Sequence, residues 1–376
     1  MSLEALIELS RYYGSKIEYV LAGGGNTSWK DGDTLYVKAS GTSLSNAALD
    51  SFVKLDRNVL GQMIKKEYPE PGDDPFGSRR EDAVLKDMMA ARKTEENKRP
   101  SVEALLHEIL PFAFVVHLHP ALVNGLCCSK QGEEAARGIF GEEVIWIPSC
   151  NPGYMLSRCV KKEIDVYYTK YGRHAQIIFL QNHGIFVGAE SAASIGELYG
   201  EVMSKISAMI KRKPDFSGEK RTVQPGPEGA STVLLQNAEI SALVKDRSSF
   251  APVSGAFTPD HIVYSGSDPL FIEEGMNIQN AMKHHAEKTG GHSKIIAIQG
   301  FGVFGAAETE AAAEVALDLF KDAVKIAAYS ESFGGPLFMA QDKIDFINNW
   351  EVERYRSSVL IKNPGEKGSC DENLSE

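Results

Sequence analysis

The chain has 376 residues, enough for one large or two ordinary domains, and its 43% hydrophobic and 24% charged residues are typical of a folded globular protein. Forty Lys and Arg against 51 Asp and Glu give a formal net charge of −11, which argues against nucleic acid or an anionic membrane surface as a partner. No stretch approaches the roughly 20 apolar residues that a membrane helix requires.

The first residues and the cysteines indicate the compartment. Residues 1–13 contain Glu4 and Glu8 and lack the apolar block of an export signal. The five cysteines are an odd number without CxxC spacing, which is typical of reduced thiols and not of a disulfide framework or a zinc ribbon. We therefore expect a cytoplasmic protein.

Hydrophobic periodicity and turn residues predict the elements of the first half. A helix begins after Ser2 and ends before Gly14, and a hairpin follows with its turn at Asp31-Gly32. Pro111 ends a helix and precedes an apolar run over 112–116 that is typical of a buried strand. In chain order, the remaining expected elements are helices over 79–92 and 102–110, a strand over 144–147, a helix over 157–171, strands over 177–180 and 185–187, and a helix over 192–210. This alternation predicts mixed α/β layering.

Composition suggests how the chain is divided. Residues 212–232 are rich in Lys, Pro, Gly, Glu and Ser and show little periodicity, as in a linker or a long surface loop. We expect a first domain over 1–215, a linker over 216–235, an α/β carboxy-terminal domain over 236–361 and a polar tail over 362–376.

A partial internal repeat connects the two expected domains. Residues 177–190 align without gaps on residues 295–308, with seven of fourteen positions identical, and a helical pattern follows each copy. His183 of the first copy corresponds to Phe301 of the second. We therefore expect the second copy to be structural and to bind no metal.

Three histidines suggest a metal site. His117 and His119 are two residues apart on a predicted strand, so their imidazoles share a face while Leu118 points to the opposite layer. Such a pair is also found by chance at the surface end of a strand. His183, at a tight turn between two strands, supplies a third ligand. The set favours an open three-histidine site for zinc or another divalent metal, with positions left for substrate.

Glu103 begins the helix before the histidine strand. An acid at a helix start is commonly structural, because it favours the helix dipole and fits a cap with Ser101. Only one helix separates it from the histidines, however, so it is also a candidate for contact with the metal or its substrate. His107, one turn later, is expected to pack against or orient its neighbours rather than bind the metal.

Two glycine loops are candidate phosphate sites. Residues 23–27, Gly-Gly-Gly-Asn-Thr, lack the GxGxxG spacing and precede a strand, which argues against a dinucleotide site. Glycines beside the donors Asn26 and Thr27, with a second loop at 40–42, are typical of a phosphate nest to which Lys38 adds charge. A simple flexible turn is the alternative.

Taken together, these residues resemble the class II aldolase/adducin family. The motifs in family order cover about the first 210 residues: Gly-Asn-Thr-Ser at 25–28, Ser-Gly at 40–41, Pro-Ser-Val-Glu at 100–103, His-Leu-His-Pro at 117–120 and Asn-His-Gly at 182–184. The stretches 331–337 and 346–351 are similar to the aldolase portion of bifunctional rhamnulose-1-phosphate aldolase/dehydrogenases. The chain ends where their dehydrogenase portion would begin.

The resemblance implies a fold and an activity. The expected fold is an α/β class, three-layer α/β/α domain with a mixed, largely antiparallel central sheet, followed by a smaller α/β domain that partly repeats it. The expected activity is that of a zinc-dependent aldolase, a carbon–carbon lyase of carbohydrate metabolism. It would cleave a ketose 1-phosphate, such as a rhamnulose-1-phosphate-like sugar, to dihydroxyacetone phosphate and an aldehyde. The expected partner is thus a small sugar phosphate, and we expect a homo-oligomer.

The resemblance also implies roles for single residues. The metal ligands would be His117, His119 and His183, and Glu103 would transfer the proton. The phosphate would be bound by a set of loop residues: Asn26, Thr27, Ser40, Gly41 and Ser101. At two positions the chain departs from the family: Val102 replaces a second serine, and Ser149 replaces a tyrosine acid, for which Tyr154 is a candidate substitute.

Alternatives to the aldolase activity stay open at this point. Epimerisation of a pentulose phosphate and dehydration of a thio-ribulose phosphate occur on the same fold, and an adducin-like module would bind partners without metal. Glu in place of Asp at position 103 argues weakly against the epimerase. The three histidines argue against the metal-free module, because function follows from the site and not from the fold.

Overall fold

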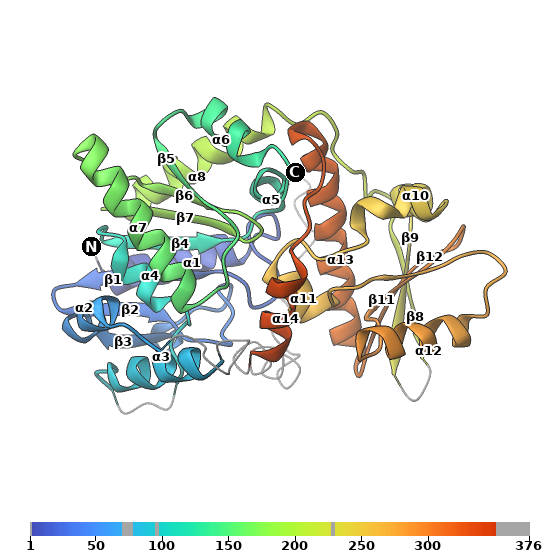
Figure 1. Cartoon of the computed structure of the whole chain (residues 1–376), viewed down its shortest axis with the longest axis horizontal. Helices are drawn as coiled ribbons and strands as arrows, with labels where there is room; N and C mark the ends of the chain where they lie inside the picture. The colour runs from blue at the N-terminus through green and yellow to red at the C-terminus, as the bar shows by residue number, and fades with distance from the viewer. Residues whose placement is uncertain (1, 70–77, 95–97, 227–229, 351–376) are drawn as a thin grey trace, which may run out of the picture.

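The computed structural model describes residues 2–69, 78–94, 98–226 and 230–350 and contains two β-sheets (Figure 1). The larger sheet has seven strands in the order β3-β2-β1-β4-β7-β6-β5, all antiparallel except for the parallel pair β5 and β6. Its strands are β1 (Asn26–Asp31), β2 (Thr34–Lys38), β3 (Phe52–Asp56), β4 (Phe114–Leu118), β5 (Val144–Ile147), β6 (Ile177–Leu180) and β7 (Gly184–Ala189). The expected mixed, largely antiparallel sheet is confirmed.

Helices cover both faces of this sheet. One face packs against α1 (Leu3–Gly14), α5 (Ala121–Cys127), α6 (Gly132–Phe140) and α8 (Ala192–Ser207). The other face packs against α2 (Arg57–Lys65), α3 (Ser78–Ala90), α4 (Ala104–Ile109) and α7 (Tyr154–Tyr171). The result is three layers, as the apolar faces of sheet and helices require.

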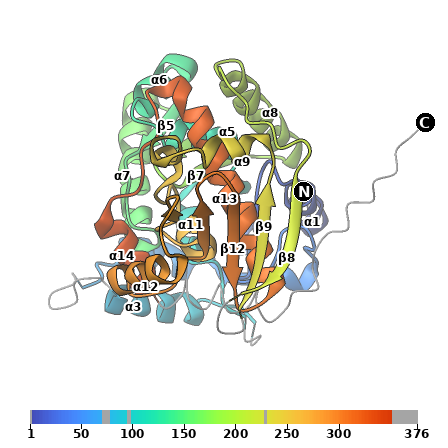
Figure 2. The same ribbon diagram turned by 90° about the vertical axis from the view of Figure 1, so that its right-hand side faces the viewer.

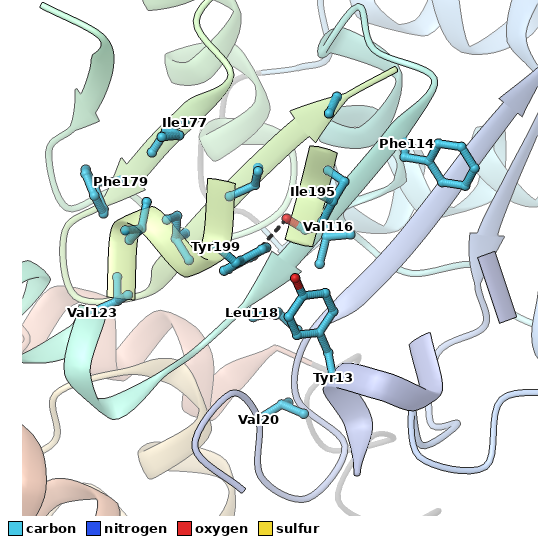
Figure 3. Packing of buried hydrophobic residues seen from close by; sticks show 14 of the residues in the cluster. Tyr13, Val20, Phe114, Val116, Leu118, Val123, Ile177, Phe179, Ile195 and Tyr199 are labelled. Atoms are coloured by element: carbon cyan, nitrogen blue, oxygen red, sulfur yellow. Dashed lines mark hydrogen bonds between the residues drawn. The ribbon is translucent and has the colours of Figure 1, made fainter. Parts of the chain in front are cut away.

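The central strand β4 is fixed by burial on both faces. Phe114, Val116 and Leu118 belong to the core under α1 and α8, whereas Val115 belongs to the opposite core. Tyr199 of α8 is fully buried and donates its hydroxyl to the Val116 carbonyl at 3.2 Å (Figure 3). Each large apolar side chain buried here contributes about 1.5–3 kcal/mol. The strand that carries two of the candidate ligands is therefore firmly held.

The second sheet has five strands in the order β10-β11-β12-β9-β8, and only β10 and β11 are parallel. Its strands are β8 (Lys220–Pro225), β9 (Ser231–Gln236), β10 (Leu270–Ile272), β11 (Ile295–Ile298) and β12 (Gly302–Ala307). The accompanying helices are α9 (Ala238–Leu243), α10 (Arg247–Phe250), α11 (Pro259–Ser265), α12 (Ile278–Thr289), α13 (Glu310–Ser330) and α14 (Gln341–Asn349). We call this part of the chain, which follows α8, the carboxy-terminal region.

Helix α13 joins the two parts of the molecule. It packs on the second sheet and lies between that sheet and α5 (Figures 1 and 2). At Gly125 of α5 an added Cβ would lie 2.3 Å from the Cβ of Tyr329, so only glycine permits this approach of the two helices. The carboxy-terminal region is thus packed directly against the helices that cover the larger sheet.

The expected linker over 216–235 is wrong for most of its length, because residues 220–225 and 231–236 form β8 and β9. Strand β8 is an edge strand that is largely exposed and polar, so it has no buried face to give a hydrophobic pattern. Strand β9 buries Val233 and Leu235 in the second core. The expected tail over 362–376 lies outside the described residues, as do residues 351–361 of the expected second domain.

The two segments proposed as repeats have similar local structure. Residues 177–207 form β6, β7 and α8, and residues 295–330 form β11, β12 and α13, with the strand bounds 118 residues apart. Phe301, at the position of His183, is 48% exposed and stacks on Phe304. A common origin of the two segments stays a prediction.

Two further observations concern thiols and membranes. Among the described residues, Cys127, Cys128, Cys150 and Cys159 are free, and the sulfurs of Cys150 and Cys159 lie 3.1 Å apart. Within the described ranges, no helix combines the length and the apolar character needed to cross a bilayer.

Candidate functional site

The topology of the larger sheet brings the predicted motifs to one edge. Strand β1 is antiparallel to both β2 and β4, and β4 is antiparallel to β7. The beginnings of β1 and β7 therefore lie at the same edge as the ends of β2 and β4. The glycine loop before β1, the Ser40-Gly41 loop after β2, His119 after β4 and His183 before β7 meet at this edge.

The three histidines converge on one point. The Nε2 atom of His117 lies 2.9 Å from Nε2 of His119 and 3.2 Å from Nε2 of His183. One ring nitrogen of each lies within 4.8 Å of those of the other two. Zinc–nitrogen bonds of 2.0–2.1 Å in tetrahedral geometry place two ligand nitrogens about 3.3 Å apart. The spacing fits a single metal ion.

The outer ring nitrogens determine which nitrogens face the centre. His117 Nδ1 donates to the carbonyl of Ile185 at 2.9 Å, and His119 Nδ1 lies 2.5 Å from a carboxylate oxygen of Asp260. With the proton on Nδ1 in both rings, both Nε2 atoms point a lone pair at the centre, 2.9 Å apart. Two lone pairs at this distance repel unless a cation lies between them, so the donor set fits a divalent metal.

Neighbouring residues fix the orientation of the histidine rings. The ring of His117 stacks on Phe186, its partner across the strands, with centroids 4.1 Å apart and planes at 13°. Asn182 adopts φ +57 at the turn that presents His183. At Gly184 an added Cβ would lie 2.5 Å from the Leu118 carbonyl oxygen, so this position requires glycine.

Burial keeps the imidazoles of His117 and His183 neutral. It lowers the pKa of His183 to about 3 and lowers the pKa of His117 well below its ordinary value. Both rings are thus in the unprotonated form that binds metal at neutral pH.

Glu103 points at the histidines and does not cap its helix. Its Oε2 lies 3.4 Å from His117 Nε2, and its Oε1 lies 3.4 Å from His183 Nε2. The side chain is 7% exposed, makes no capping hydrogen bond in α4, and leaves Oε1 buried without a hydrogen-bond partner. A buried carboxylate oxygen left unsatisfied is costly. A metal ion or a substrate proton would satisfy it.

A chain of hydrogen bonds through Asn26, His107 and Ser28 fixes the Glu103 carboxylate. Asn26 Nδ2 donates to Glu103 Oε2 at 2.7 Å, and Asn26 Oδ1 accepts from Nε2 of His107. His107 Nδ1 then accepts from the hydroxyl of Ser28 at 2.7 Å, as required for a neutral ring. Burial lowers the pKa of His107 to about 3, in agreement with a neutral ring. The sequence pattern indicated an orienting role for His107 but gave no signal for the Asn26–Glu103 contact.

The unfolding free energy of the metal-free protein is expected to fall as the pH falls from 6.5 toward 3. Unfolded His107 takes up a proton near pH 6.5, whereas the folded state resists until about pH 3, so acid favours the unfolded state. This one group should cost about 2 kcal/mol between pH 7.5 and pH 5. Urea unfolding of wild type and His107→Gln at both pH values measures the effect. Equal pH dependence of the two proteins would contradict a buried neutral imidazole.

One cavity contains most of the predicted site residues. Its lining includes the following predicted residues: Asn26, Ser40, Gly41, Ser101, Glu103, His119 and His183. Lys38, expected only to add charge, also lines it and is 4% exposed. The carboxy-terminal region contributes Pro259 to this lining, and the loop before α7 contributes Pro152.

The cavity is not lined by the fully buried His117, by Thr27 or by Tyr154. Thr27 follows Asn26 on β1 and therefore points to the opposite face, where its hydroxyl lies 2.7 Å from that of Ser10 in α1. Its side chain is directed away from any phosphate in the cavity, which corrects its predicted role. Tyr154, the candidate acid, donates its hydroxyl to the carbonyl of Lys66 at 3.0 Å and does not line the cavity either.

Comparison with known proteins identifies related chains. A curated relative, "Uncharacterized oxidoreductase YuxG" from Bacillus subtilis (strain 168), is 22% identical over 95% of this chain and 58% of its own length. The chain thus spans little more than half of that relative. Among solved structures, the N-terminal class II aldolase domain of a conserved protein from Thermoplasma acidophilum is 21% identical with a TM-score of 0.47, covering 55% of this chain and 93% of that one. L-fuculose-1-phosphate aldolase from Thermus thermophilus is 13% identical with a TM-score of 0.36, covering 55% and 95%.

A family match covers the site itself. The family described as "Class II Aldolase and Adducin N-terminal domain" matches residues 4–199, more than half of the chain. The matched range includes Glu103, the histidine strand β4 and the turn with His183. The chain therefore belongs to the class II aldolase and adducin N-terminal domain family.

Proposed function

We propose that the protein is a zinc-dependent aldolase that cleaves a ketose 1-phosphate to dihydroxyacetone phosphate and an aldehyde. The proposal rests on the position of the Glu103 carboxylate beside the three histidines. Its unsatisfied Oε1 and its second oxygen each lie 3.4 Å from a histidine Nε2. A cation-binding triad with a buried carboxylate beside it is what proton transfer next to a polarised carbonyl requires.

The metal would be held by His117, His119 and His183. When bound, it would act as a Lewis acid that stabilises the negative charge left when a carbon–carbon bond next to a carbonyl breaks. Glu103 is placed to move the proton at the carbon that carries this charge. Asn26 holds Oε2 of Glu103 and leaves Oε1 directed at the centre, so proton transfer is assigned to Oε1.

The substrate phosphate would be bound by other residues of the same cavity lining. Gly25 and Gly41 adopt φ +66 and +79, conformations that let backbone amides approach an anion. Lys38, Ser40 and Ser101 provide side-chain donors around the same cavity. A buried lysine supplies the charge that a phosphate needs in this acidic protein.

The cavity in this structure encloses about 40 Å³, room for an ion and a few water molecules. A sugar phosphate is larger, so we propose that substrate entry displaces part of the lining. Pro152, in the loop before α7, belongs to that lining. Displacement of lining loops on substrate binding is common in enzymes that exclude water from the reaction.

Several finer expectations belong to the same proposal. A rhamnulose-1-phosphate-like ketose is the proposed substrate, in a cytoplasmic, homo-oligomeric enzyme. We propose that residues 1–215 form the catalytic domain and that the carboxy-terminal region arose by partial duplication. The strand orders β5-β6-β7-β4 and β10-β11-β12-β9, each with one parallel pair at the edge strand, support this duplication.

The proposal is tested by incubating the zinc-loaded protein with a panel of ketose 1-phosphates. Dihydroxyacetone phosphate is measured by coupled reduction with NADH, and the same sugars without phosphate are the control. We expect release from at least one phosphorylated ketose and none from its unphosphorylated form. Formation of an epimer or loss of water without carbon–carbon cleavage would instead assign epimerase or dehydratase activity. No reaction with any sugar phosphate would contradict the proposal that the protein is an enzyme acting on these substrates.

A further inference from the structure

The carboxy-terminal region contacts one candidate ligand, His119, and the residue that precedes another, His183. The carboxylate of Asp260 in α11 accepts the Nδ1 proton of His119 at 2.5 Å. The side-chain amide of Asn182, the residue before His183, donates to the carbonyls of Phe257 and Leu337 at 3.2 and 2.8 Å. Both contacts connect the histidine edge of the first sheet with segments more than 70 residues away in the chain.

Asp260 is held in a fixed position. It is the second residue of α11, which follows the cap residue Thr258 and packs against α13 and α14. The side chain of Asp260 is 5% exposed, and that of His119 is 9% exposed. An added Cβ at Gly24 would lie 2.6 Å from Oδ2, the same oxygen that contacts Nδ1 of His119. The carboxylate therefore lies close to both the imidazole and the glycine loop.

We propose that Asp260 is a positioning residue of the metal centre, through which the carboxy-terminal region fixes the tautomer and orientation of His119. This proposal rests on the proposed metal site. A carboxylate that accepts the outer N–H of a ligating imidazole keeps the lone pair of the inner nitrogen directed at the metal and strengthens its donation. His117 obtains the same help from the Ile185 carbonyl of its own sheet, but His119 obtains it from across the interface.

The proposal changes the role of the carboxy-terminal region. The sequence predicted a structural copy there, and Phe301 does not line the cavity. Asp260 instead makes this region part of the active centre. Without it, the larger sheet and its helices would lack the carboxylate that orients His119. Burial of Asp260 without a cationic or hydrogen-bonding neighbour would be costly, and the N–H of His119 satisfies that need.

The test compares the zinc dissociation constants of wild type, Asp260→Asn and Asp260→Ala, measured by competition with a chelator at fixed pH. We expect the affinity to fall about 10- to 100-fold in Asp260→Ala, the usual cost of losing such a partner. Asp260→Asn keeps an acceptor oxygen but loses the charge, so its affinity should be intermediate. The absorption spectrum of the cobalt-substituted proteins should change in the same order, because it reports ligand geometry.

The matched control is Asp322→Asn, another buried carboxylate, which lies 3.4 Å from His261 of the same helix α11. This variant disturbs the packing of α11 on α13 but leaves His119 its acceptor, so its zinc affinity should stay close to wild type. Thermal unfolding of the metal-free variants shows which of them remain folded.

The outcomes separate this proposal from the proposed function. Wild-type zinc affinity in both Asp260 variants, while wild type binds zinc, would overturn the positioning role alone. An equal loss in Asp322→Asn would assign the effect to packing and also overturn it. Failure of the wild-type protein to bind zinc would overturn the proposed metal site and this proposal with it.

Discussion

His117→Ala is expected to abolish both zinc binding and turnover. His117 is the central member of the triad, fully buried, and its Nε2 lies within 3.2 Å of both other Nε2 atoms. Its removal takes away one of three ligands, so the loss of affinity should exceed the 10- to 100-fold that loss of a supporting residue causes. Elemental analysis and the dihydroxyacetone phosphate assay measure both losses on one preparation.

Two further variants show whether loss of zinc in His117→Ala results from the lost ligand or from misfolding. His183→Ala removes a ligand at the turn, outside the central strand, and should also lose zinc. His107→Gln changes another buried histidine, which faces Asn26 and Ser28 and not the centre, so it should keep zinc. Zinc bound normally by folded His117→Ala would contradict the three-histidine site.

Glu103→Gln is expected to keep zinc but to lower kcat by about 10²–10⁴-fold, the usual share of general acid–base catalysis. The substitution keeps the shape of the side chain and an oxygen that can accept from Asn26, but it removes the group that takes up a proton. The three imidazoles are untouched. Steady-state kinetics should show the loss in kcat with a smaller change in KM.

Glu108→Gln is the matched control for Glu103. Glu108 lies on the same helix, one turn later, and forms an ion pair with Arg57 at 2.9 Å, outside the cavity. Its substitution should leave kcat within a few fold of wild type. Near-normal turnover of Glu103→Gln on the true substrate would remove Glu103 from the mechanism.

The histidine site could be predicted because its determinants are local. The alternation of a β-strand places His117 and His119 on one face and Leu118 on the other, and the structure shows this arrangement. His183 is presented by a tight turn that was visible as Asn182-His183-Gly184. The same alternation separates Asn26 from Thr27, so the direction of Thr27 away from the cavity followed from its position on β1.

Other features depend on contacts that no local pattern reports. Asp260 lies 141 residues from His119, and an acid in the first turn of a helix is already explained by the helix dipole. Glu103 was equally ambiguous until its carboxylate was seen to face the triad. Strand β8 was missed because a polar edge strand has no buried face and gives no hydrophobic alternation.

The most direct test of the account is the zinc content of the purified chain after removal of loosely bound metal. The proposed site predicts one zinc ion per chain in wild type and none in folded His117→Ala or His183→Ala. A wild-type chain without zinc, or variants that keep it, would contradict the metal centre on which the proposed reaction depends.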